Sequence, residues 1–199
     1  MAIRTRISAS EITENISRLC MDANFNLNDD VLDALRDSYE AEVSPVAKEV
    51  FAELLENAKI AHECQMPICQ DTGVAVVFVE IGEDVEIVGG RLCDAIHEGV
   101  REGYKKGFLR KSMVKDPLNR INTGDNAPAI IHTEFTAESH LKITFMAKGG
   151  GCENMSRLAM LTPADGREGV INFVVETVKI AKANPCPPII VGVGIGGTF

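Results

Sequence analysis

Residues 66–81 read MPICQDTGVAVVFVEI, and the chain changes character within this stretch. Pro67 ends the helical pattern that precedes it, because proline lacks the amide hydrogen that a helix interior needs. The run Val74–Ile81 is rich in β-branched and apolar residues, which is typical of a strand buried on both faces. The stretch therefore predicts helices before Pro67 and a β-sheet after it.

The first third of the chain contains three segments with helical spacing of apolar residues. A capping box at residues 8–11 opens the first, Asn28 caps the second, and Ser44-Pro45 opens the third. Each segment repeats its apolar residues three or four positions apart, so each predicts an amphipathic helix with one buried stripe.

Further strands are expected after the stretch. Residues 85–88 are expected to return beside the first strand, and residues 130–135 are expected to pair with residues 141–147 as a hairpin. Residues 189–197 predict a last strand that runs into glycines.

Two amphipathic helices, over residues 92–107 and 170–181, complete the expected architecture. The predicted fold class is α/β of the mixed α+β kind: a helical N-terminal third, then a mixed β-sheet flanked by helices. The length fits a single domain over residues 1–199. Because the chain stops at Phe199, directly after an apolar strand that lacks a covering element, we expect it to be truncated at its C-terminus and to belong to a longer polypeptide.

Composition excludes several classes of function. The chain has 20 Lys plus Arg against 29 Asp plus Glu, a net charge of −9, which argues against a nucleic-acid binder. Trp is absent and aromatic residues are 5%, so a stacking platform for bases is not expected. No run reaches the roughly 18 apolar residues that a membrane span needs. The N-terminus shows no secretory signal, so we expect a cytoplasmic protein whose six cysteines are ligands or buried thiols.

Positive charge is concentrated in residues 101–115, which hold six basic side chains and one acidic one. Such a segment in an acidic protein can bind a small anion. A solvated helix face followed by a lysine-rich turn explains the same charges, and the sequence leaves both interpretations open.

The turn before the predicted strand places a thiol, an amide and a carboxylate side by side, as Cys69, Gln70 and Asp71. A thiolate suits soft metals and iron–sulfur clusters. The alternative is a buried cysteine beside an Asp71 that caps its own backbone. Cys186 lies between prolines, whose stiffness suits a metal ligand; an inconsequential loop cysteine is the alternative.

The other cysteines are weaker candidates for metal ligands. His62, Cys64 and Cys69 would form only half of a structural zinc site, while Cys20 and Cys93 fit buried core positions.

Two glycine turns also deserve an interpretation. Gly192–Gly197 matches Gly-x-Gly-x-x-Gly, but a dinucleotide site also needs a βαβ unit with an acidic residue about 20 positions further on, and the sequence ends first. The turn at residues 149–151 can bring backbone N–H groups to a carboxylate, or can simply end a strand.

Six sequence blocks occur in a fixed order, and together they resemble one family. They resemble the α subunit, or N-terminal region, of the class I iron–sulfur hydro-lyases, the family of fumarate hydratase and L(+)-tartrate dehydratase. The resemblance covers the chain from about residue 60 to its end. The blocks are PICQDTG (67–73), REGY (101–104), LRKS (109–112), NTGDN (122–126), KGGG (148–151) and the segment 186–198, which begins CPP.

The resemblance implies a 4Fe–4S cluster held by three cysteines, with one iron left open for substrate. Cys69 and Cys186 fall on two of the ligand positions, and the third ligand is expected beyond Phe199. Cys152 stands where the family carries a small residue that does not bind metal, so it is not assigned as a ligand.

The resemblance also implies roles for four other residues. Asp71 would transfer a proton, and Gln70 would donate a hydrogen bond to substrate. Arg110, which lies inside the basic segment, would bind one substrate carboxylate. Gly150 would bring main-chain donors to the second carboxylate.

The implied activity is the reversible hydration of fumarate to (S)-malate, a step of the tricarboxylic acid cycle. The same chemistry on L(+)-tartrate is the alternative. A β subunit or C-terminal domain would complete the active site, and αβ units would assemble into an oligomer. A nucleotide-binding domain that uses the Gly192–Gly197 turn is the alternative from another class.

Overall fold

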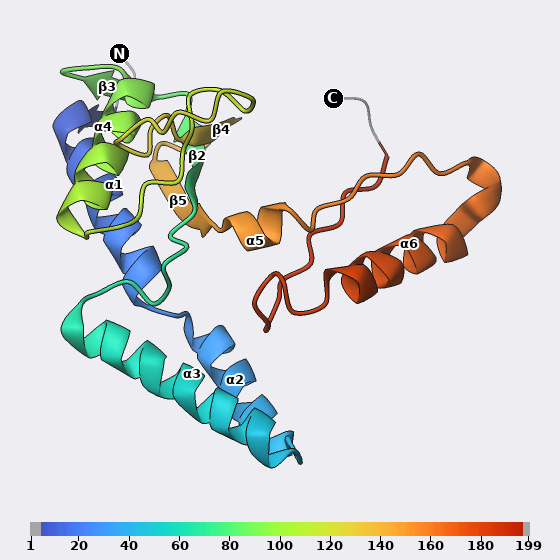
Figure 1. Cartoon of the computed structure of the whole chain (residues 1–199). Coiled ribbons are helices and arrows are strands. Elements are labelled where there is room, and N and C mark those ends of the chain that lie inside the picture. The colour runs from blue at the N-terminus through green and yellow to red at the C-terminus, as the bar shows by residue number, and fades with distance from the viewer. Residues whose placement is uncertain (1–4, 197–199) are drawn as a thin grey trace. The chain divides into compact units, whose positions relative to one another are not determined.

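In the computed structural model, which describes residues 5–196, the deciding stretch forms strand β2 (Val74–Gly82). Strand β2 is the centre of a three-stranded sheet (Figure 1). Strand β4 (Ile130–Thr136) pairs with it in parallel, and strand β5 (Leu141–Lys148) pairs with it antiparallel. The predicted mixed sheet and the predicted fold class are therefore confirmed.

Two predicted strand pairings are wrong. The two strands expected to form a hairpin do not pair with each other but flank β2 on opposite sides. Strand β3 (Val85–Val88) pairs not with β2 but with β1 (Thr5–Ser8), a strand that the sequence analysis did not predict. The physical reason is that the most apolar strand takes the central, most buried position, while strands with more polar side chains occupy the edges.

Helices α1 (Ala9–Phe25) and α4 (Leu92–Lys106) supply the main hydrophobic core over one face of β2. Of the capping box predicted at the start of α1, the Ser8 contact is present, since the Glu11 amide donates to the Ser8 hydroxyl at 3.1 Å. The fully buried centre of this core combines residues from β2 and both helices: Ile16, Cys20, Val77, Val79, Ile96, Val100 and Tyr104.

Glycines allow α1 and α4 to approach each other closely. A Cβ atom at Gly103 would lie 2.6 Å from the Cβ of Cys20 and 2.8 Å from the carbonyl oxygen of Ser17. A Cβ atom at Gly99 would lie 2.6 Å from the Cβ of Ile16. All three distances are shorter than any normal contact, so these two positions admit no side chain while the helices keep this spacing.

The second face of β2 buries Val76 but is exposed at Phe78, so the expectation of a strand buried on both faces is wrong at Phe78. Phe78 is 41% exposed, and its neighbours His132 and Thr144 on the flanking strands are exposed as well. Alternating side chains point to opposite faces of a strand, and α1 and α4 cover only the face of Val77 and Val79.

The other two predicted N-terminal helices are confirmed as α2 (Asp29–Ala41) and α3 (Pro45–Cys64). They pack against each other as a helical pair. The Ser44 hydroxyl caps α3 by accepting from the Ala47 amide at 3.5 Å, with Pro45 in the first turn. Helix α3 ends at a left-handed Gln65 (φ 51°), just before the Pro67 expected to end it.

The chain divides into two compact units, Met1–Lys148 (unit 1) and Gly149–Phe199 (unit 2). Unit 2 contains α5 (Gly150–Glu153), the 3₁₀ helix η1 (Pro163–Asp165) and α6 (Gly166–Ala181). Helix α6 confirms the last predicted helix. A single domain over residues 1–199 stays a prediction.

The strand expected over residues 189–197 is absent up to Gly196, and Gly197 lies outside the described residues. A strand needs a partner for its backbone groups, and the described part of unit 2 offers none. Within residues 5–196, no helix combines the length and the apolar composition needed to cross a membrane.

We expect Gly103→Ala to lower the free energy of unfolding by about 1–3 kcal/mol, because the added methyl group forces α1 and α4 apart. Helix propensity alone would raise stability by about 1 kcal/mol, so the sign of the change identifies the cause. Urea unfolding followed by circular dichroism measures it. Gly194→Ala is the control, since a Cβ there meets nothing within 4 Å. A Gly103→Ala chain as stable as the parent would contradict the close packing.

Candidate functional site

The turn that carries Cys69, Gln70 and Asp71 joins α3 to β2 and is anchored at its start. The Ile68 amide donates to the Asn24 carbonyl oxygen at 2.9 Å. The Asn57 side-chain amide donates to the Ile68 carbonyl oxygen, also at 2.9 Å. These bonds fix the point at which the turn leaves the helices.

The end of the same turn is tied to the segment around Arg110 by buried polar side chains. The Thr72 hydroxyl donates to the Arg110 carbonyl oxygen at 2.7 Å. The hydroxyl of Tyr104, a fully buried residue of α4, donates to the Thr72 carbonyl oxygen at 2.7 Å. Burial is the main reason that the pKa of Tyr104 lies above its usual value, so this hydroxyl stays a donor. The basic segment is thereby held beside the thiol-bearing turn.

Asn126 joins a third segment to this arrangement. Its side chain is fully buried, and its Oδ1 accepts from the amides of Ser112 (2.6 Å) and Met113 (3.0 Å). Its Nδ2 donates to the Gly73 carbonyl oxygen at 3.2 Å. Asn126 belongs to the block NTGDN (122–126), but its residue type alone predicts no role for it. A buried amide that satisfies three backbone groups is a positioning residue, visible only once its distant partners are known.

Two contacts with α4 hold the loop that carries Asn126. Arg101 Nε donates to Asp125 Oδ2 at 2.8 Å. Burial opposes the charge of Asp125, but hydrogen bonds from the Ala127 amide and Arg101 outweigh it and lower the pKa of this carboxyl. The Ala129 amide donates to Nδ1 of His97 at 3.1 Å, directly before β4 begins.

The reactive groups of the turn lie at the surface. Cys69, Gln70 and Arg110 are exposed, and Asp71 is half-buried. The Asp71 amide donates to the Cys69 sulfur at 3.4 Å, and the Gly73 amide donates to Asp71 Oδ1 at 3.2 Å. The alternative interpretation of this turn was a buried Cys69 beside an Asp71 that caps its own backbone. The Asp71 contact is present, but Cys69 is exposed. Unit 1 therefore carries four of the six predicted site residues on two segments that the Thr72–Arg110 hydrogen bond joins.

The other two predicted residues lie in unit 2, on adjacent segments. Gly150 begins α5, and the next residue, Gly151, packs so closely that a Cβ there would lie 2.7 Å from the Asn184 carbonyl oxygen. Cys186 follows two residues later, exposed, with a left-handed backbone (φ 57°). A single site formed by all six residues stays a prediction.

The donor chemistry of these positions fits an iron–sulfur cluster in part. Cys69 presents an exposed thiol that accepts an amide hydrogen, the kind of hydrogen bond that tunes cluster sulfur ligands. Cys186 presents a second exposed thiol. Across residues 5–196 no three His, Cys, Asp or Glu side chains gather closely enough to hold a metal ion. Cys69 and Cys186 as two ligands of one cluster stay a prediction.

The other cysteines behave differently. Cys20 is buried in the core, as predicted, and burial raises the pKa of its thiol to about 12. Cys93 is exposed, so the predicted core position is wrong for this residue. His62, the histidine of the zinc interpretation, contacts Asn26 Oδ1 through Nδ1 at 2.7 Å, and nothing in the described chain supports zinc there.

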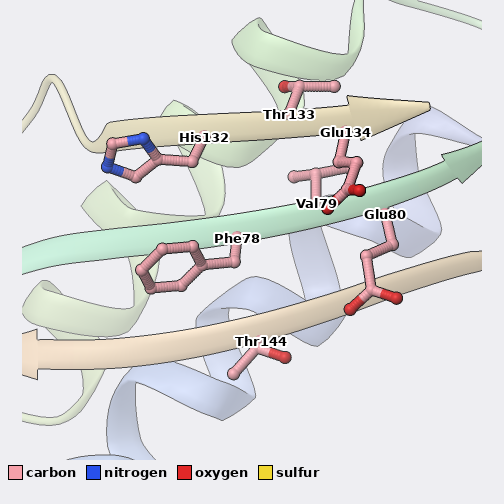
Figure 2. A pocket seen from close by; sticks show the side chains of 7 residues that line it. All are labelled: Phe78, Val79, Glu80, His132, Thr133, Glu134 and Thr144. Carbon is pink, nitrogen blue, oxygen red and sulfur yellow. The ribbon is translucent and has the colours of Figure 1, made fainter. Parts of the chain in front are cut away.

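A shallow pocket lies elsewhere in unit 1, on the face of the sheet that carries Phe78 (Figure 2). The rings of Phe78 and His132 stack there with their centroids 5.1 Å apart and an interplanar angle of 16°. Glu80, farther along β2, forms an ion pair with Lys142 at 2.6 Å. None of the predicted site residues lines this pocket, so we do not assign it to the candidate site.

Comparison with known proteins now decides the family. A family model described as Fumarate hydratase (Fumerase) matches residues 13–199. The chain belongs to this family. The resemblance drawn from the six sequence blocks is confirmed, and the chain is a member of a hydro-lyase family. This family membership gives no support to the dinucleotide interpretation of Gly192–Gly197.

Two relatives of this fumarase-family chain carry names of tartrate dehydratase subunits. A protein of Methanocaldococcus jannaschii, provisionally named L(+)-tartrate dehydratase subunit alpha, is 42% identical over 196 residues and covers 94% of this chain. The L(+)-tartrate dehydratase subunit alpha of Escherichia coli is 31% identical over 191 residues and also covers 94%. The chain spans 68% and 63% of the lengths of these two relatives.

We expect Asn126→Ala to lower the free energy of unfolding of this fumarase-family chain by roughly 1–3 kcal/mol or more, because buried backbone groups lose their partner. Urea unfolding measures the change. Asn119→Ala, at an exposed site in the same loop region, is the control and should change stability little. Equal effects of the two substitutions would show that the buried amide does not hold the three segments together.

His97 is expected to make stability fall as the pH is lowered. Burial, followed by the nearby charge of Arg101, lowers the pKa of His97 below 6.5, against the opposing effect of Asp94. The unfolded chain therefore binds the proton first, so this contribution is complete above pH 6.5 and is lost as the pH falls towards the folded pKa.

Urea midpoints measured between about pH 7.5 and about pH 5 test this expectation. His97→Asn is the matched variant, because its side-chain oxygen can still accept from the Ala129 amide but does not titrate. It should flatten the dependence over this range. A parent chain and a His97→Asn chain with the same slope would contradict the assignment.

Proposed function

We propose that this chain is the α component of an iron–sulfur hydro-lyase that adds water to fumarate to give (S)-malate, and reverses this step. One observation carries the proposal. An exposed thiol and a carboxyl occupy a turn whose backbone is locked to the Arg110 segment by the buried groups Thr72, Tyr104 and Asn126. In this proposal, the two linked segments carry a metal-binding group, a proton carrier and a carboxylate receptor.

Cys69 and Cys186 are the residues of this chain that would hold a 4Fe–4S cluster, with the third cysteine expected beyond Phe199. When bound, the cluster supplies an open iron that acts as a Lewis acid on the substrate hydroxyl or on water. The Asp71 amide, which donates to the Cys69 sulfur, would orient this thiolate towards its ligand.

Arg110 is the proposed receptor for one substrate carboxylate. Its guanidinium is exposed and lies in the segment with five more positive than negative charges, in a protein whose net charge is −9. Arginine suits this task because its planar group donates two parallel hydrogen bonds to a carboxylate. The Thr72 hydroxyl holds the Arg110 backbone, which fixes where the side chain begins.

Asp71 is the proposed proton carrier. Fumarate hydration adds a proton to one carbon and a hydroxyl group to the other, so the reverse reaction removes a proton beside a carboxylate. The Gly73 amide donates to Oδ1 of Asp71 and so limits rotation of the carboxyl group. Gln70, which directly precedes Asp71, is exposed and is proposed to donate a hydrogen bond to substrate. Gly150 is proposed to present main-chain donors to the second carboxylate.

The proposed assembly includes a second component. Both relatives are named as alpha subunits, and the chain spans about two thirds of their length. We therefore propose that a β-type subunit or domain completes the active site and that αβ units form a larger oligomer. The proposed location is the cytoplasm, where reducing conditions preserve thiol ligands such as Cys69 and Cys186.

L(+)-tartrate is the second candidate substrate, because both relatives carry tartrate dehydratase names. Tartrate is also a four-carbon dicarboxylate that loses water across adjacent carbons. The same roles for Asp71 and Arg110 serve both substrates.

The decisive experiment compares two variants in the full α polypeptide assembled with its β-type partner and reconstituted with iron and sulfide without oxygen. Cys69→Ala should lose both cluster absorbance and turnover, because a ligand is gone. Arg110→Gln should retain the cluster but lose about tenfold to a thousandfold in kcat/KM, because a charged carboxylate contact is missing. Fumarate and L(+)-tartrate are tested in parallel, and the faster substrate settles which of the two is used.

Cys64→Ala and Lys111→Gln are the matched controls, since each changes a neighbouring residue of the same type without a proposed role. Both should retain cluster and turnover. Normal iron content in Cys69→Ala would defeat the proposed ligand. An absence of turnover with both substrates, in a protein that holds its cluster, would defeat the proposed substrate class.

A further inference from the structure

Cys152 and Cys186 lie on two segments of unit 2 that pack directly against each other. The Cys152 thiol, on α5, donates to the Pro185 carbonyl oxygen with a sulfur–oxygen distance of 3.3 Å. The carbon of this carbonyl is bonded to the amide nitrogen of Cys186. Standard backbone geometry places the Cα of Cys186 roughly 3 Å from that oxygen, and hence within roughly 6 Å of the Cys152 sulfur.

Other contacts hold the two segments in this arrangement. Gly151 approaches the Asn184 carbonyl oxygen so closely that a Cβ there would lie at 2.7 Å. The Asn184 side-chain amide contacts the Met155 sulfur at 3.6 Å. The Cys186 amide donates to the Ala183 carbonyl oxygen at 3.0 Å, which closes a tight turn. The proximity of the two cysteines therefore follows from packing on both sides of Cys152.

The two thiols differ in access. Cys186 is exposed, whereas Cys152 is only partly exposed and is engaged with the Pro185 carbonyl group. An exposed thiol meets a dissolved oxidant first, and a neighbouring thiol can then resolve the oxidised sulfur. A disulfide joins two sulfurs about 2.05 Å apart, so the Cys152 sulfur must turn from the Pro185 carbonyl oxygen towards the Cys186 sulfur, whose Cα lies within roughly 6 Å of it.

We propose that Cys152 is the resolving thiol for Cys186, and that the two form an intramolecular disulfide when Cys186 is not bound to metal and a peroxide is present. The Cys186 sulfur attacks the peroxide, breaks the O–O bond and becomes a sulfenic acid, with release of one water from hydrogen peroxide. The Cys152 sulfur then attacks the sulfenic sulfur, forms the S–S bond and releases a second water. The two sulfurs together give up the two electrons that reduce the peroxide.

The disulfide would protect Cys186 from irreversible oxidation. A sulfenic acid without a neighbouring thiol proceeds to sulfinic and sulfonic acids, whereas a disulfide is reduced again by small thiols. This protective role rests on the proposed function, because it matters most for a cysteine that must later bind a cluster. The formation of the bond rests on the geometry of unit 2 alone.

The test uses the cluster-free 199-residue chain, reduced and then treated with one equivalent of hydrogen peroxide. Remaining thiols are alkylated, the chain is digested, and linked peptides are identified by mass spectrometry. We expect the Cys152–Cys186 linkage to exceed every other linkage by about tenfold or more, because held proximity greatly raises the effective concentration of a partner. A random distribution over the six thiols, or a dominant linkage of another pair, would overturn the proposal.

Three variants sharpen the outcome. Cys152→Ser should abolish the linkage and raise the amount of Cys186 sulfenic acid trapped by dimedone. Gly151→Ala should reduce the linkage several-fold, because its methyl group pushes α5 away from the 184–186 turn. Cys64→Ser is the control and should leave the linkage unchanged. Full linkage in Gly151→Ala would show that the close contact does not set the proximity.

A final comparison separates this proposal from the proposed function. The same oxidation is repeated after incubation with iron and sulfide without oxygen. If Cys186 binds a cluster, the linkage should appear only as iron is released. Linkage that forms equally with and without iron would contradict the ligand role of Cys186 but support the thiol pair. Absence of linkage in the cluster-free chain would overturn the thiol pair and leave the ligand role to be judged by iron binding.

Discussion

The Gly73 carbonyl oxygen accepts a hydrogen bond from Nδ2 of Asn126 at 3.2 Å, and it lies 3.4 Å from the Tyr104 hydroxyl, whose single hydrogen it shares with the Thr72 carbonyl oxygen at 2.7 Å. Burying a polar group without a hydrogen-bond partner costs free energy. The segments can therefore stay packed together only while all of these bonds are formed. These hydrogen bonds hold the end of the turn that carries Cys69 and Asp71. The chemistry proposed for the turn depends on this constraint, since an exposed thiol on a loose loop would have no defined place for a ligand.

Packing of the hydrophobic core makes the hydrogen bonds of Tyr104 to the turn possible. Tyr104 reaches the turn because α4 lies unusually close to α1, and Gly99 and Gly103 permit that approach. The same helices cover Val77 and Val79 of the strand that follows Gly73. Packing and polar contacts thus act on the same few residues. A change in helix spacing would move the Tyr104 hydroxyl and, through it, the turn.

Unit 2 also contains a close contact that a glycine permits. Gly151 brings α5 against the turn at Asn184, as Gly103 brings α4 against α1. In unit 1 this closeness positions a tyrosine hydroxyl, and in unit 2 it positions the thiol of Cys152 beside the Pro185 carbonyl oxygen. In both units a glycine in a helix allows a reactive segment to be held by a neighbouring side chain. In the proposed function, both segments serve the binding and hydration of a dicarboxylate.

Local patterns in the chain were enough to locate nearly every helix and the strands β2, β3, β4 and β5, because caps, prolines and apolar spacing act over a few residues. The same patterns singled out Cys69, Asp71 and Arg110 through their residue types and the family blocks. They did not reveal which strands pair, that β2 is exposed at Phe78, or that Asn126 is the link between segments. Those features depend on partners far apart in the chain, such as Gly73 and Asn126, 53 residues distant. Only the folded arrangement brings such groups within hydrogen-bonding distance.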